Sequence, residues 1–172
     1  TRSYCVPVIM DVAGKMQLIL SGSKCVASYD PDTGKQLWLI DGPTEQYVAS
    51  LVEARGIVFM TAGFPEYHVM GIRPDGTGNV SKTHVAWHEK TTPLGASYVP
   101  SPIAYQDWFF LVTDTGRAYC FDALTGKRLW SEKLGKQFRL GHLFVPVALE
   151  IEVCQAADGG GMLVVPIPHR QV

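Results

Sequence analysis

The sequence predicts an all-β protein built from repeated four-stranded antiparallel units, and a duplicated motif is the main reason. The stretch 29–38 (YDPDTGKQLW) returns as 121–130 (FDALTGKRLW), with an aromatic residue, Asp, Thr-Gly, Lys, Leu and Trp in the same order. The copies start 92 residues apart (121 − 29), which is two periods of about 46. Repeats of that length made of short strands are typical of β-propeller blades. The 17 Gly and 11 Pro also suit short strands joined by tight turns.

Each copy of the motif is expected to form a strand, a turn and a second strand. The aspartate ends the first strand and can accept backbone N–H groups of the turn, and the glycine supplies a positive φ. The tryptophan is expected to anchor neighbouring sheets, because it buries more area than other side chains. A degenerate middle copy contributes Trp87, so three tryptophans should occupy equivalent buried places. The motif residues are Asp30, Thr33, Gly34 and Trp38 in one copy, Asp122, Thr125, Gly126 and Trp130 in the other, and Trp87.

The repeat predicts a single partial propeller domain over residues 1–172, with about three and a half blades. The fourth unit is atypical, because it contains neither a tryptophan nor Thr-Gly. The strand at 16–21 contains the continuous apolar run Leu18-Ile19-Leu20, so we expect it to be buried on both faces. The expected units are 6–42, 47–90, 98–134 and 144–167.

With the pattern Asp-x-x-Thr-Gly-x-x-x-Trp in both copies, the chain resembles the pyrroloquinoline-quinone-like (quinoprotein-type) propellers over roughly residues 6 to 134. That family contains alcohol and glucose dehydrogenases as well as non-enzymatic relatives. In character the chain is most similar to the outer-membrane lipoprotein that assists β-barrel assembly. The resemblance implies that the motif holds blades together, and that the protein is bacterial and periplasmic or secreted.

The resemblance also implies what an enzyme of this family needs: adjacent cysteines, a catalytic Asp, and Glu and Asn ligands for calcium. No Asp/Glu/Asn set can be carried over onto this sequence, so no catalytic residue is assigned and no cofactor is predicted. The predicted function is a scaffold or protein-binding segment. Two alternatives stay open, a calcium-dependent propeller hydrolase or lactonase and a quinoprotein oxidoreductase fragment that binds pyrroloquinoline quinone. The cysteines are far apart and expected to be free thiols: Cys5, Cys25, Cys120 and Cys154.

Two groups of residues resemble metal sites. The carboxylates at 30–34 have the spacing of the start of a calcium loop, but position 41, where a bidentate Glu is required, holds Asp41 beyond a strand. A structural turn is therefore expected there. His84 and His88 are four residues apart on an expected strand, hence on one face, and His68 is the candidate third ligand. The alternative is two half-exposed histidines on an outer strand.

The net charge and the number of blades indicate which binding partners to expect. The net charge is −1 and no basic cluster is present, so neither nucleic acid nor an anionic membrane is an expected partner. No apolar run reaches the length of a membrane-spanning helix. Three blades and part of a fourth would leave apolar faces open at both ends. We therefore expect a fragment of a longer propeller that completes its ring by homodimerisation, besides a protein partner.

Overall fold

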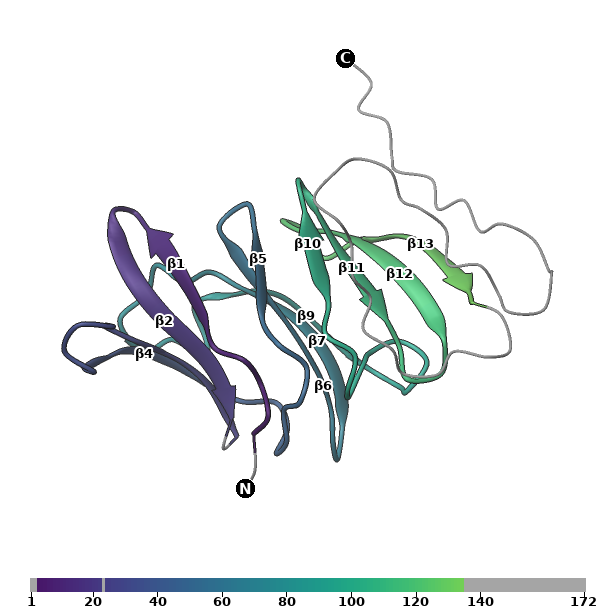
Figure 1. The fold of residues 1–172 in the computed structure, drawn as a ribbon, viewed down its shortest axis with the longest axis horizontal. Coiled ribbons are helices and arrows are strands. Elements are labelled where there is room, and N and C mark those ends of the chain that lie inside the picture. Colours follow the sequence, from purple (N-terminus) through teal and green to yellow (C-terminus); the bar gives the residue numbers. More distant parts are fainter. Residues whose placement is uncertain (1–2, 23, 135–172) are drawn as a thin grey trace, which may run out of the picture. The chain divides into compact units, whose positions relative to one another are not determined.

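The computed structural model describes residues 3–22 and 24–134, which fall within one compact unit, Thr1–Leu134 (Figure 1). The described residues form strands, turns and loops and contain no helix, which confirms the all-β prediction. The expected fourth unit at 144–167 lies outside the described residues.

Three antiparallel meanders form the blades of a partial β-propeller. Blade 1 contains β1 (Val8–Val12), β2 (Lys15–Gly22), β3 (Cys25–Tyr29) and β4 (Gln36–Asp41). Blade 2 contains β5 (Val52–Ala54), β6 (Ile57–Gly63), β7 (Tyr67–Ile72) and β9 (Val85–Thr91). Blade 3 contains β10 (Ile103–Tyr105), β11 (Trp108–Val112), β12 (Arg117–Asp122) and β13 (Arg128–Lys133).

A short strand in the long hairpin of blade 2, β8 (Gly78–Asn79), joins blade 1 instead. It pairs in parallel with β4 and makes blade 1 five-stranded. The side chain of Asn79 donates to Asp41 Oδ2 at 2.9 Å, and the backbone N–H of Asp41 donates to Ser81 Oγ at 2.8 Å. The sequence predicted only a lengthened hairpin at this place. The insertion therefore ties two blades together along an outer edge.

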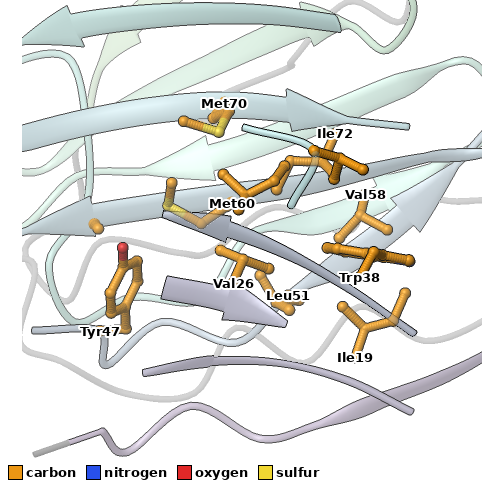
Figure 2. Packing of buried hydrophobic residues seen from close by; sticks show 12 residues of the cluster. Ile19, Val26, Trp38, Tyr47, Leu51, Val58, Met60, Met70 and Ile72 are labelled. Atoms are coloured by element: carbon orange, nitrogen blue, oxygen red, sulfur yellow. The ribbon is translucent and has the colours of Figure 1, made fainter. Parts of the chain in front are cut away.

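The apolar core lies between the blades, because each sheet buries its faces against its neighbours. Along β6, alternate side chains enter two different clusters: Val58 and Met60 pack with blade 1, and Phe59 packs with blade 3. Figure 2 shows the first cluster, in which Trp38 lies between Ile19 and Val58. This arrangement follows from the period-2 alternation of a strand, which sends successive side chains to opposite faces.

Burial on both faces is complete only in the middle blade. Every residue of β6 is buried. In β2, Ile19 is buried against blade 2, whereas Leu18 and Leu20 point to the opposite face and are half-buried. The expectation that this apolar run is buried on both faces is therefore wrong. Leu18 and Leu20 are half-buried because, among the described residues, blade 1 packs against another blade on one face only.

Candidate functional site

The duplicated motif forms two turns of the same geometry, at 30–34 and 122–126, and we call these segments docking turns. In the first, Asp30 Oδ1 accepts the backbone N–H groups of Asp32 (3.1 Å) and Thr33 (3.0 Å). In the second, the Asp122 carboxylate accepts both the N–H and the hydroxyl of Thr125. The glycines have φ of +69° and +68°, which only glycine adopts without strain.

These bonds account for the first docking turn without a metal. The backbone and hydroxyl of Thr33 hold the pKa of the Asp30 carboxyl below its ordinary value, and Lys15, 3.9 Å away, acts in the same direction. Asp30 Oδ1 accepts hydrogen bonds from the backbone of its own turn. This geometry supports the interpretation of residues 30–34 as a structural turn.

The second docking turn holds the tryptophan of the preceding blade. Trp87 Nε1 donates to the carbonyl oxygen of Ala123 at 2.9 Å. A Cβ added to Gly126 would lie 2.3 Å from the indole, and a Cβ added to Gly71 of its own sheet would also lie 2.3 Å from it. The ring is therefore clamped between two glycines, and only residues without a side chain allow this approach.

Trp38 is linked to the corresponding turn of blade 2, residues 73–77, through the side chain of Gln17. Its Nε1 donates to Gln17 Oε1 (2.8 Å), which also accepts from Ser28 Oγ (2.7 Å), and Gln17 Nε2 donates to the carbonyl of Pro74 (3.1 Å). Pro74 occupies the place that Ala123 has in blade 3. The sequence analysis did not identify Gln17 as a link between Trp38 and Pro74. The feature that could have indicated it is a single amide side chain within an otherwise apolar strand.

The three motif tryptophans occupy equivalent places but differ in burial. Each lies beside a β-bulge, with Trp38 opposite Ser28, Trp87 opposite Gly71 and Trp130 opposite Cys120. The places are equivalent, as expected, but burial is complete only at Trp38, because Trp87 and Trp130 are half-buried. Trp130 Nε1 is shielded from solvent and has no hydrogen-bond acceptor among the described residues.

The two candidate metal-ligating histidines do not share a site. His84 precedes β9 and contacts Thr83 (2.8 Å) and Asp75 (3.7 Å). His88 lies on β9, and its Nε2 is 2.9 Å from His68 Nδ1. A β-bulge at Gly71/Ile72 inserts one residue between the two positions and reverses the alternation of faces. The prediction that His84 and His88 lie on one face of the strand is therefore wrong. The predicted proximity of His68 is found for His88.

His68 and His88 form a coupled pair next to a salt bridge. His68 is 3% exposed, and its Nε2 lies 3.5 Å from the Glu66 carboxylate, which is bound to Lys90 at 2.5 Å. Lys90 lowers the pKa of Glu66. Burial lowers the pKa of both histidines, and in His88 the charge of His68 acts in the same direction. The lowered pKa values favour the neutral form of both rings, and one ring nitrogen donates to the other across the 2.9 Å contact.

This pair should make the fold sensitive to acid. Because the folded pKa values lie below the unfolded value of 6.5, the unfolded chain binds more protons as pH falls through 6.5, and stability decreases from that point downward. We expect the urea midpoint to fall more between pH 7.5 and pH 5.5 in the wild type than in His68→Gln. Equal pH dependence in both proteins would contradict this account. His84→Gln is the matched control, because it removes a histidine that lies outside the pair.

A groove of about 450 Å³ is lined by the first strands of all three blades and the residues next to them. Of its described lining residues, Glu53 is the one with an ionisable side chain, and it accepts the backbone N–H of Gly56 at 2.7 Å. We call this the first-strand groove. Ile9 is 58% exposed within it. The lining is Val8, Ile9, Met10, Leu51, Val52, Glu53, Pro102, Ile103 and Ala104.

The remaining candidate groups form no reactive cluster in the described part of the chain. Cys5, Cys25 and Cys120 are free thiols there, and burial raises the pKa of the Cys120 thiol to about 12. Cys154 lies outside the described residues. Within 3–22 and 24–134, no three His, Cys, Asp or Glu side chains gather as a metal site would require, and no helix could span a membrane.

Solved structures of propeller proteins share this fold. BamB from Moraxella catarrhalis matches 70% of the chain with a TM-score of 0.53 and 16% identity, and 34% of its own length is covered. The quinohemoprotein alcohol dehydrogenase ADHIIG from Pseudomonas putida HK5 matches 76% with a TM-score of 0.56 and 16% identity, over 20% of its length. A europium-containing methanol dehydrogenase matches 72% with a TM-score of 0.52 and 15% identity, over 23% of its length. The chain thus spans between 20% and 34% of the length of each of these neighbours.

Blade architecture, docking turns and these neighbours define a β-propeller protein of the pyrroloquinoline-quinone type. The family model described as outer membrane protein assembly factor BamB matches residues 7–169, so the chain belongs to this family, as its motif predicted. A search of the curated proteins finds no match. The neighbours include both an assembly factor and dehydrogenases, so the family alone leaves the activity open.

Proposed function

We propose that this chain is a protein-binding scaffold segment, and that the first-strand groove receives apolar side chains of its partner. The observation that carries the proposal is the character of the groove, where three blades converge on one apolar, solvent-open surface. Contiguous apolar surface that is open to solvent and formed by several elements is a feature of interaction sites. Membership of the family described as assembly factor BamB supports the same conclusion.

The groove suits a protein segment better than a small substrate. Sites for small molecules combine an apolar lining with a few convergent polar groups that fix the orientation of the ligand. Here the lining offers one carboxylate, Glu53, and that group is engaged by the backbone of its own turn. Ile9 and the half-buried Ile103 instead offer the flat apolar contact that an interface core uses.

Site-specific photo-crosslinking tests this directly. A photoreactive residue at Ile9 or Ile103 should crosslink to a protein of defined mass in extracts. The same residue at Leu94 should not, because Leu94 is equally exposed (58%) but lies on a loop that does not line the groove. Ile9→Glu should reduce the crosslink from Ile103 by about tenfold, since a charge at an interface core is left without a partner.

Two outcomes would overturn the proposal. One is equal crosslinking from Ile9, Ile103 and Leu94, which would remove the groove as a specific surface. The other is quinone-dependent alcohol oxidation or lactone hydrolysis by the purified chain that is abolished by a chelator, because it would establish an enzyme instead. Thermal unfolding of each variant shows whether the fold is intact.

A further inference from the structure

A second pocket, of about 580 Å³, lies between blades 1 and 2, and we call it the inter-blade pocket. One wall belongs to blade 1 and includes the turn end of its first hairpin and residues 35–37, and the other wall is residues 75–77 of blade 2. The buried Gln17 also lines the pocket, and its amide joins Trp38 of blade 1 to Pro74 of blade 2. The volume is within the range of sites for small molecules.

Both walls of this pocket depart from the blade repeat. The pairing of β1 with β2 has five residue pairs, against three for β5 with β6 and three for β10 with β11, and the extra pairs lie at the turn end. The second hairpin of blade 2 has twelve residues between its paired ends, 72 and 85, against six in blades 1 and 3. Insertions in repeat proteins often lie on the binding face. Two insertions that meet at one pocket therefore indicate a ligand site.

The blade 1 wall of the inter-blade pocket is positively charged. Lys15 Nζ lies 3.9 Å from Asp30 Oδ2, while Asp30 Oδ1 accepts N–H groups of its own turn. The exposed Lys35 lines the same wall, and its ammonium group has no partner among the described residues. Two ammonium groups thus share one carboxylate, which leaves one positive charge uncompensated. An acidic group of a ligand would compensate it through charge-assisted hydrogen bonds.

The blade 2 wall offers hydrogen-bonding groups of a different kind. The Asp75 side chain is 65% exposed and lies 3.7 Å from His84 Nε2. The Thr77 hydroxyl has no partner within the described part of the chain. A carboxylate accepts hydrogen bonds from hydroxyl groups, and a threonine hydroxyl both donates and accepts them. Because Asp75 repels a second carboxylate, this wall favours the uncharged, hydroxyl-bearing part of a ligand whose acidic group lies at the lysines.

We propose that the inter-blade pocket binds a small hydroxy acid, a molecule with one carboxylate and several hydroxyl groups. Lys15 and Lys35 bind the carboxylate, and Asp75 and Thr77 bind the hydroxyl groups. The ligand then contacts both insertions and links blade 1 to blade 2. The inference does not rest on the proposed function, because the inter-blade pocket and the first-strand groove share no lining residue.

Titration of the isotope-labelled 172-residue chain with sodium threonate, followed by amide NMR at constant ionic strength, tests the proposal. Saturable shifts should appear at pocket residues such as Ala13, Lys35 and Gly76. Threitol has the same carbon chain without the acid, and butyrate keeps the acid without the hydroxyl groups. Each should bind about tenfold more weakly than threonate or worse, because each engages one wall only.

Lysine variants show whether the pocket itself binds the acid. Lys35→Gln should raise the dissociation constant for threonate about fivefold or more, because it removes one of the two cations. Lys127→Gln is the matched control, since Lys127 occupies the same place in the second docking turn, is exposed and does not line the pocket. It should leave the constant unchanged, and thermal unfolding shows whether each variant keeps its fold.

Three results would overturn the proposal. The first is the absence of saturable shifts with threonate up to about 10 mM, a concentration that would reveal even weak binding. The second is equal affinity for threonate and either threitol or butyrate, because the two walls would then not act together. The third is an equal effect of Lys35→Gln and Lys127→Gln, which would show that the acid responds to surface charge and not to the pocket.

Discussion

Replacing Gly126 by Ala should lower the free energy of unfolding by about 2–5 kcal/mol, whereas Gly34→Ala should cost about 1–2 kcal/mol. Both substitutions place a Cβ on a residue in the left-handed region, which accounts for the smaller figure. Only at Gly126 does the new methyl group also meet an indole, at 2.3 Å. Trp87 must then move, which adds an overpacking cost of about 1–3 kcal/mol and lengthens its bond to Ala123.

Urea unfolding of the two variants and the wild type measures the difference. An equal loss of stability in the two variants would mean that the indole does not restrict Gly126. The same backbone geometry in both turns makes the pair a matched control.

Trp38→Ala is expected to be the most destabilising change in blade 1, at about 3–5 kcal/mol. Trp38 is fully buried between blades 1 and 2, so the substitution leaves a cavity beside Ile19 and Val58 (Figure 2). It also removes one of the two donors to Gln17 Oε1.

Trp38→Phe separates these two contributions. It keeps most of the apolar contact and removes the N–H, so we expect a smaller cost of about 1–3 kcal/mol. Chemical unfolding of both variants, followed by circular dichroism, gives the comparison. A cost for Trp38→Ala below that of Trp38→Phe would contradict the packing account.

The sequence was sufficient to predict the features that depend on residues close together in the chain. The docking turns depend on an aspartate that bonds residues two and three positions ahead and on a glycine with positive φ, and both features can be identified from the letters at 30–34 and 122–126. The period of the motif was likewise sufficient to predict four-stranded blades, because strands and turns repeat with it.

Features that depend on contacts between blades could not be predicted in the same way. The pairing of β8 with β4 depends on bonds among Asn79, Ser81 and Asp41, residues some forty positions apart, and a two-residue strand has no periodicity. The separation of His84 from His88 depends on a single-residue bulge. The partial exposure of Leu18 and Leu20 depends on which blades have neighbours, which an apolar run does not show.

Blades 2 and 3 of this chain are held together by the indole of Trp87 seated on a glycine turn, and a double-mutant cycle between Trp87 and Gly126 tests this contact. Gly126→Ala should cost about 2–5 kcal/mol in the wild-type background and only about 1–2 kcal/mol when Trp87 is replaced by Leu, since the clash is then absent and the backbone strain remains. The cost in the Trp87→Leu background should then match that of Gly34→Ala. A cost of Gly126→Ala that is the same with and without the indole would contradict the account.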